Sequence, residues 1–152
     1  MKRIVFFTLL CFMLFSCGKE KKDCGLPPPI FFLLVNKSSE SYKEFINEKG
    51  EIDEEHISLY KQENGQKKLY RLFFGSTNIP NNSNEYLEIG TELGFENDVY
   101  TGKTETLYLQ NATRTYKIEV DGYTKETGCG LANIINEMRV DDKKIETRFL
   151  AK

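Results

Sequence analysis

The 152-residue sequence has a single histidine, His56, and no tryptophan. Histidine is the side chain that most often acts as a general base or metal ligand near neutral pH. One histidine falls short of the three or four ligands of an ordinary metal site, although an acidic metal cluster with Asp53, Glu54 and Glu55 is the alternative. We favour a solvated loop before a strand here, and we predict no metal and no cofactor.

Short motifs of nucleotide, hydrolase and redox sites are also missing. The chain has no P-loop, G-x-G-x-x-G, G-x-S-x-G, H-E-x-x-H or C-x-x-C sequence. Cys129 lies between two glycines, as a nucleophile on a tight turn does, but a catalytic thiolate needs a neighbouring base that nothing in the sequence places there. We therefore predict a protein without catalytic residues, and an envelope hydrolase is the alternative.

A strong charge of one sign is absent as well. The 21 basic and 23 acidic residues leave a net charge of −2, and no dense cluster of lysine and arginine occurs. A nucleic-acid-binding domain needs a basic patch for the phosphates, so we expect no nucleic-acid partner. A protein held at an anionic membrane by charge alone would need a similar patch.

Long hydrophobic runs are limited to the N-terminus. Ile4–Phe15 has 12 residues, fewer than the ~17–25 that a membrane-spanning helix needs. Lys2 and Arg3 precede this run and Ser16 follows it. A basic start, an apolar middle and a small residue at the end are typical of a secretory signal peptide. We predict that residues 1–16 are this signal and are removed.

Leu14-Phe15-Ser16-Cys17 resembles the lipobox of bacterial lipoproteins. In that family the cysteine is acylated on its sulfur, the chain is cut just before it, and the new amino group is acylated too. The resemblance implies lipidation of Cys17 and a covalent lipid anchor as the contact with the membrane. Gly18, rather than aspartate, favours the outer membrane and leaves the periplasmic face and the cell surface as alternatives. We interpret residues 17–29 as a charged, then proline-rich, flexible tether.

The cysteines that remain after lipidation are Cys24 and Cys129, because Cys11 leaves with the signal. An exported protein folds in an oxidising compartment, where a single pair of cysteines is expected to bridge. We predict a Cys24–Cys129 disulfide. Two free thiols, or pairing between molecules through Cys24, are the alternatives.

Residues 30–152 have the pattern of a β domain. Ile30–Val35 is apolar without a break, which predicts a strand buried on both faces, and later segments alternate apolar and polar residues. Asn64-Gly65 is the strongest hairpin signal, and Asp121-Gly122 predicts another turn. The expected strands cover about 30–35, 56–60, 68–74, 86–89, 104–110, 115–120, 132–140 and 144–149, with a short helix or an irregular crossover in 38–51. We predict one antiparallel β-sandwich of about eight strands, of Ig-like or Greek-key type, with a partly open barrel as the alternative.

Five tyrosines are the candidate binding residues. Several alternate with aliphatic residues that point inward, so their rings are expected at the surface, where tyrosine suits recognition of sugars and proteins. These tyrosines are Tyr60, Tyr70, Tyr86, Tyr108 and Tyr123. Cross-strand aromatic pairing explains the same positions, and we favour it.

The whole layout resembles small lipoproteins of the Bacteroidota that have no characterised function. The resemblance is carried by the lipobox, by Cys24-Gly25-Leu26-Pro27-Pro28-Pro29 before a strand, Phe31 to Lys37, and by the late Cys129. It implies a β-sandwich and supplies no catalytic residue. We expect a lipid-anchored, non-enzymatic module that binds a partner or glycan of the cell envelope, with an envelope hydrolase or hydrolase inhibitor as the alternative.

Overall fold

The structure is a computed structural model that describes residues 30–80, 83–93, 97–128, 130–146 and 148–151. The predicted signal peptide, the lipidation site Cys17 and the tether lie outside these residues. Both cysteines of the predicted disulfide, Cys24 and Cys129, lie outside them as well.

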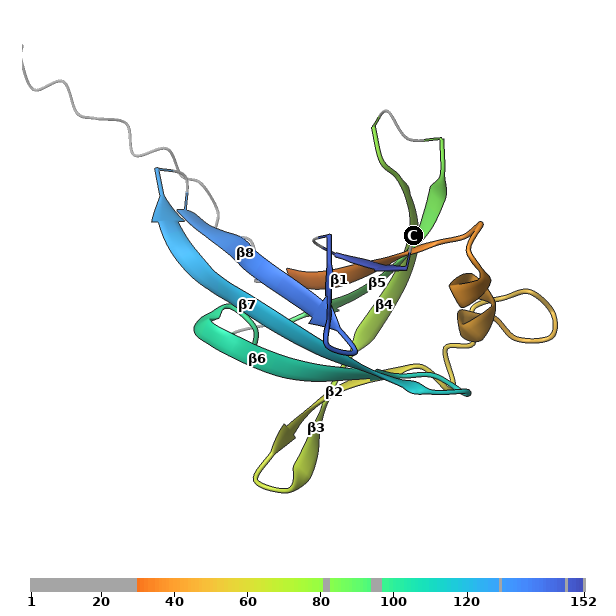
Figure 1. The fold of residues 1–152 in the computed structure, drawn as a ribbon, viewed down its shortest axis with the longest axis horizontal. Helices are drawn as coiled ribbons and strands as arrows, with labels where there is room; N and C mark the ends of the chain where they lie inside the picture. The colour runs from red at the N-terminus through yellow and green to blue at the C-terminus, as the bar shows by residue number, and fades with distance from the viewer. Residues whose placement is uncertain (1–29, 81–82, 94–96, 129, 147, 152) are drawn as a thin grey trace, which may run out of the picture.

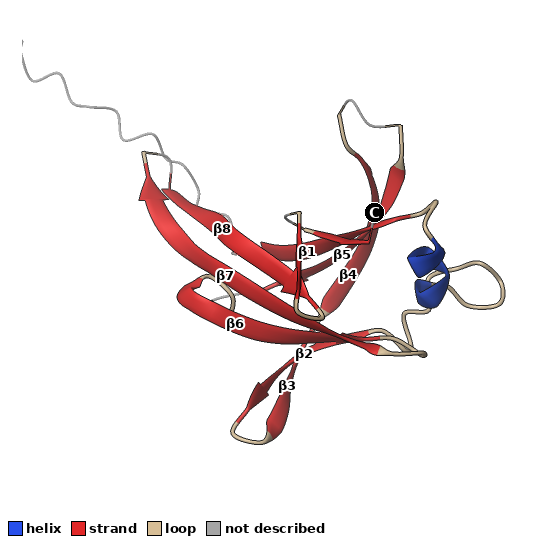
Figure 2. Cartoon of the chain, viewed as in Figure 1, coloured by secondary structure: helices blue, strands red, loops and turns tan. Residues whose placement is uncertain are grey.

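The described residues form two β-sheets that pack against each other (Figures 1 and 2). In chain order, the elements of the structure are β1 (Ile30–Asn36), a short 3-10 helix η1 (Glu40–Phe45), β2 (Ser58–Glu63), β3 (Gln66–Tyr70), β4 (Leu72–Asn78), β5 (Glu85–Glu92), β6 (Thr101–Gln110), β7 (Thr115–Thr127), β8 (Gly130–Val140), β9 (Lys143–Ile145) and β10 (Phe149–Ala151). The four-stranded sheet has the order β10-β1-β5-β4, and the six-stranded sheet has the order β3-β2-β6-β7-β8-β9. The predicted all-β sandwich is confirmed.

Most neighbouring strands are antiparallel and consecutive in the chain. β2–β3 and β4–β5 are hairpins, and β6 to β9 form a meander. β1 and β10 pair in parallel, so the beginning and the end of the domain lie side by side. Asn64 and Gly65 both have positive φ at the β2–β3 turn, which confirms the predicted hairpin and matches a type I′ turn.

The single strand predicted over residues 68–74 is wrong, because the chain changes sheets at Arg71. Before it, Tyr70 pairs with Leu59 in the six-stranded sheet; after it, Leu72 pairs with Thr91 in the four-stranded sheet. The Thr91 hydroxyl donates a hydrogen bond to the Arg71 carbonyl at 2.8 Å. The predicted strand over 144–149 divides in the same way into β9 and β10, which belong to different sheets.

The turn predicted at Asp121-Gly122 is also wrong. β7 runs through both residues and has an irregular register there. A Cβ atom on Gly122 would lie 2.9 Å from the Ile134 carbonyl oxygen and 3.1 Å from the Tyr100 ring. The glycine is therefore needed for close packing inside the sheet, and this is a use that local sequence does not distinguish from a turn.

The core lies between the two sheets. Inward-facing residues of β1, β5, β6 and β7 alternate with outward-facing ones, as a sandwich requires. The largest fully buried side chains are Phe31, Phe45, Leu33, Leu87, Leu107, Leu109, Ile118, Met138, Val35, Val99, Val120 and Thr91. Phe45 at the end of η1 stacks on Tyr116 with ring centroids 6.0 Å apart, so the helix covers one end of the core.

Candidate functional site

An aromatic row crosses the outer face of the six-stranded sheet. Leu59 is buried in the core, so its neighbour Tyr60 points to the opposite face, where it pairs with Tyr108 of β6 and Leu69 of β3. The two tyrosine rings stack with centroids 5.3 Å apart. We call Leu69, Tyr60 and Tyr108 the aromatic row.

The row is shielded unevenly from solvent. Leu69 is 66% exposed and Tyr108 is half-buried, whereas Tyr60 is only 7% exposed. The Lys67 ammonium lies 4.0 Å from the centroid of the Tyr60 ring, a cation–π contact that helps to cover it. Tyr60 and Tyr108 thus make the cross-strand aromatic pair that we favoured, and a ligand would meet Leu69 and Tyr108 first.

The other three candidate tyrosines lie elsewhere. Tyr70 pairs in register with the core residue Leu59 and donates a hydrogen bond to Asp98 at 2.7 Å. Tyr86 is buried on the four-stranded sheet, with its ring edge-to-face to Phe149. Tyr123 pairs with Ile134 near the far end of β7. The structure brings two of the five predicted residues together and separates the other three.

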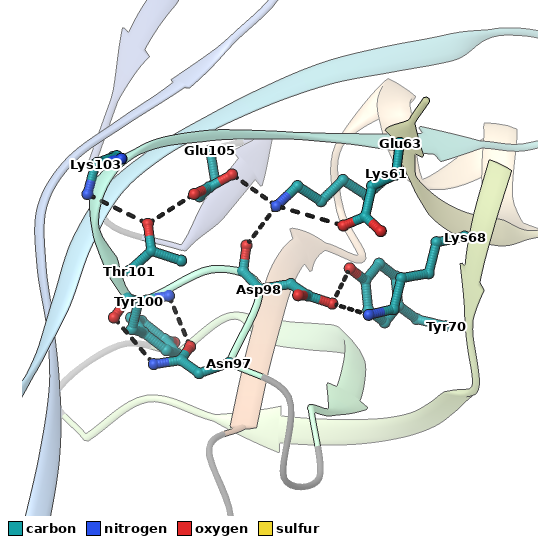
Figure 3. A network of polar contacts seen from close by, with 10 residues as sticks. All are labelled: Lys61, Glu63, Lys68, Tyr70, Asn97, Asp98, Tyr100, Thr101, Lys103 and Glu105. Atoms are coloured by element: carbon teal, nitrogen blue, oxygen red, sulfur yellow. Dashed lines mark hydrogen bonds and ion pairs between the residues drawn. The ribbon is translucent and has the colours of Figure 1, made fainter. Parts of the chain in front are cut away.

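A polar network closes the sandwich beneath the β2–β3 hairpin (Figure 3). The Asp98 carboxylate accepts the Tyr70 bond and lies 2.6 Å from the Lys68 ammonium. Lys61 pairs with Glu105 at 2.7 Å and donates to the Asp98 carbonyl at 3.3 Å. These side chains hold the loop before β6 against β2 and β3.

The carboxylates of this network are stabilised in their charged form. Burial raises the pKa of Asp98, but hydrogen bonds from Lys68 and Tyr70 outweigh it and leave the pKa below its ordinary value. Burial also opposes ionisation of Glu105, whose pKa is nevertheless lowered by Lys61. Because every group is engaged within the protein, we assign the network to the structure and not to ligand binding.

A polar hollow of about 390 Å³ lies on the same outer face as the aromatic row. Register places Thr104 beside Asp121 and Asp121 beside Glu137, across three adjacent strands. Asp121 pairs with Glu137 and Gly122 with Ile135, so β8 carries one extra residue at this point. Such a bulge bends a sheet locally and often accompanies a functional site. The lining residues are Thr104, Glu119, Asp121, Glu137 and Arg139.

The three carboxylates of the hollow differ in their partners. Glu137 is held by Arg139 at 2.6 Å and by Lys144 at 2.8 Å; hydrogen bonds from these two cations lower its pKa. Glu119 pairs with Lys117 at 3.0 Å. Within the described residues Asp121 has no ion pair and receives only a 3.4 Å contact from the Asn136 amide. Asp121 is therefore the carboxylate most available to a ligand.

The hollow contains groups that complement a hydroxyl-rich ligand. The Asp121 carboxylate accepts hydrogen bonds, the Arg139 guanidinium donates them, and the Thr104 hydroxyl does both. Thr104 and Tyr108 are four residues apart on β6, a separation of about 14 Å at ~3.4 Å per residue. An extended ligand of this length would contact both the hollow and the aromatic row.

The sequence did not identify the residues of the hollow. Alternation of apolar and polar residues places them on the outer face. It places other polar residues of β6, β7 and β8 on that face too, so it does not single out the residues of the hollow. The feature that groups them is the bulge opposite Gly122, and the sequence indicated a turn at that residue.

His56 lies away from the hollow, on the loop before β2. Its Nδ1 atom is 2.8 Å from the Asp53 carboxylate, and the hydrogen bond that the exposed His56 ring donates to this carboxylate raises the pKa of His56. No group of three or more histidine, cysteine, aspartate or glutamate side chains in the described part of the chain is placed to hold a metal ion.

Comparison of the chain with protein-family models, curated proteins and solved structures gives no match. Among the residues that the structure describes, no helix has the length and apolar character needed to cross a membrane. The outer face of the six-stranded sheet therefore provides the only geometry among the described residues from which we infer a function.

Proposed function

We propose that this chain is a lipid-anchored cell-envelope protein whose β-sandwich binds an envelope partner or glycan, without catalysis. The observation that carries the binding proposal is the polar hollow at the β7–β8 bulge, which shares one sheet face with the aromatic row. Polar groups in the hollow would orient the ligand, and the row would provide apolar contact area.

A glycan fits this combination better than a strongly charged ligand does. Two cations, Lys144 and Arg139, contact Glu137, and Lys117 contacts Glu119, so three positive charges balance the three carboxylates around the hollow. A neutral chain of sugars offers hydroxyl groups to Asp121 and Arg139 and apolar ring faces to Leu69 and Tyr108. Envelope proteins that display such glycans are included in the proposal.

The binding test uses the full-length chain in mild detergent on an array of neutral oligosaccharides and cell-wall fragments. Asp121→Asn keeps the size of the side chain and removes its charge. We expect the affinity to fall at least tenfold, which is about the effect of losing one charge-assisted hydrogen bond. Glu126→Gln, an exposed change on the same strand, is the matched control and should bind as the native chain does. Binding that is equal in both variants would exclude the hollow.

The anchor is tested by metabolic labelling with an alkyne fatty acid. The native chain should carry the label in the membrane fraction, and Cys17→Ala should lose both the label and the normal cleavage. More than one acyl chain is expected, because a single myristoyl-sized chain binds membranes only marginally. Label that persists on Cys17→Ala would contradict lipidation at this residue.

The Cys24–Cys129 bridge is tested by counting free thiols in the denatured, non-reduced chain. None is expected, and two would contradict the bridge. A loop of about 100 residues closed by a disulfide contributes up to ~4.7 kcal/mol in the chain-entropy model, so reduction should lower the unfolding midpoint markedly.

No described observation favours the hydrolase or inhibitor alternative. A hydrolase would be supported by a cleft that contains His56 and convergent carboxylates, whereas His56 contacts Asp53 on an exposed loop. Turnover of a glycan, peptide or ester that disappears in a folded His56→Ala variant would overturn the non-enzymatic proposal.

A further inference from the structure

The two sheets end in four edge strands, and these edges are not equally protected. β3 presents Lys67 and Lys68, while β9 and β10 are three residues long and β9 begins with Lys143. Short length and lysine are two of the devices by which natural proteins prevent edge strands from pairing with other chains. β4, with the sequence Leu-Phe-Phe-Gly-Ser-Thr-Asn, has seven residues and neither a charge nor a proline.

The outer edge of β4 is open among the described residues. β4 pairs with β5 along its whole length, and no hydrogen bond joins the backbone of its other side to any described residue. The Phe73 ring lies over Gly90 of β5, which is the direction away from the edge. Alternate N–H and carbonyl groups of β4 therefore remain free to pair with another strand.

The charges around β4 permit pairing with an identical strand. Lys37, the cation that contacts β4 through Ser76 at 2.7 Å, is neutralised by Glu85 at 2.7 Å. Two β4 strands placed side by side would bring no like charges together. Two β3 strands would oppose Lys67 and Lys68 with their own copies, a destabilising arrangement.

We propose that β4 pairs antiparallel with β4 of a second copy of this chain, around a two-fold axis near Gly75. The two four-stranded sheets then form one continuous sheet of eight strands. Because the same edge is used on both copies, the contact closes at a dimer and leaves no β4 edge for further growth. This proposal is independent of the proposed function, since the polar hollow lies on the other sheet.

Gly75→Lys is a substitution that separates the dimer from the fold. A Cβ atom at this position would meet nothing closer than the Glu88 Cβ at 4.0 Å. Glu88 is the cross-strand neighbour of residue 75, so the new lysine gains an opposite charge within its own chain. In the dimer, the two new lysines would lie close to each other at the axis.

The matched control is Gln66→Lys, which adds the same charge to the exposed edge strand β3. The measurement is the mass of the full-length protein in detergent micelles, by sedimentation equilibrium with correction for bound detergent. The urea midpoint of each variant reports on its fold, and it is measured at a protein concentration at which the native chain is monomeric, because a dimer would itself raise the midpoint. If Gly75→Lys does not keep the native midpoint, the double variant Phe73→Lys/Thr77→Lys takes its place, because pairing about Gly75 sets residue 73 of one copy opposite residue 77 of the other.

We expect the native chain and Gln66→Lys to be dimers, and Gly75→Lys to dissociate at least tenfold more readily with an unchanged urea midpoint. A native chain that is monomeric at a protein concentration of about 100 μM, at which even a weak dimer would form, would overturn the proposal. A dimer that persists in the folded lysine variants would overturn it too, because the contact would then lie elsewhere. Larger assemblies, or a strand of another protein bound at β4, would also overturn it.

Discussion

The outer faces of the two sheets differ in chemistry, although both sheets bury their inner faces in one core. On the four-stranded sheet, Phe32, Gly90 and Phe73 form one row across three strands. On the six-stranded sheet, the equivalent rows consist mainly of charged and hydroxyl side chains, such as Glu119 beside Arg139. The outer face of the four-stranded sheet is therefore the more apolar of the two, although Glu88 and Glu92 also lie on it.

The end of the chain accounts for much of this difference. Phe149 of β10 packs edge-to-face on Tyr86, and the Arg148 guanidinium lies 3.9 Å from the centroid of the Phe32 ring. Leu34 and Tyr86 are consequently only 6% and 4% exposed, although they point away from the core. The four-stranded sheet thus buries side chains on both faces, whereas the outer face of the six-stranded sheet stays mainly polar.

The largest expected effect concerns Leu34, which tests whether the second face of the four-stranded sheet is truly buried. Leu34→Ala should lower the free energy of unfolding by about 2–3 kcal/mol, near the lower end for leucine truncation in a core. Leu69→Ala, on the outer face of the other sheet, should change it by less than ~0.5 kcal/mol. Urea unfolding measures both, and equal losses would remove the contrast between the faces.

Two glycines allow the packing of the sheets to be compared. Gly122→Ala should cost about 1–3 kcal/mol, because its Cβ would press on the rigid Ile134 carbonyl. Gly90→Ala should cost less, because the obstacle there is the ring of Phe73, which is 38% exposed and can move. Thermal or urea unfolding of the two variants gives the order, and a reversed order would contradict the account of the bulge.

The polar network on the inner side of the six-stranded sheet predicts a loss of stability in acid. The pKa of Asp98 lies below its ordinary value of 3.8, so its contribution is present above that pH and is lost as pH falls through the lowered value. The free energy of unfolding should therefore decrease below about pH 4, and less steeply in Asp98→Asn. Glu126→Gln, an exposed change, should follow the native curve, and identical curves for all three would exclude this role.

The smallest effect concerns the exposed pair of His56 and Asp53. Because the chain has one histidine, its imidazole resonance can be titrated by NMR without assignment, in untagged protein. The pKa should lie above 6.5 and move back toward it in Asp53→Asn. Any stabilisation is present below pH 6.5 and is lost as pH rises through the raised pKa. An unchanged pKa in Asp53→Asn would contradict the assigned partner.

Local patterns predicted the β character, the Asn64-Gly65 hairpin and the buried strand at Ile30–Val35, all of which the structure confirms. Cross-strand aromatic pairing, which the sequence favoured for the five tyrosines as a group, occurs between Tyr60 and Tyr108. The hollow around Asp121 was not predicted, because it depends on one extra residue in β8 opposite β7. That residue has no local signature: it becomes a bulge only when the two strands are in register.

The sequence by itself determined which residues of β5, β6 and β7 face inward, because alternation of apolar and polar residues has the same period as the strand. Only the tertiary structure decided that the chain changes sheets at Arg71 and again between β9 and β10, and that β4 is left at an open edge. These features depend on which distant strands pair, and a period of two is identical in either sheet. The same reason explains Gly122, whose role follows from the Ile134 carbonyl and the Tyr100 ring that approach it from other parts of the chain.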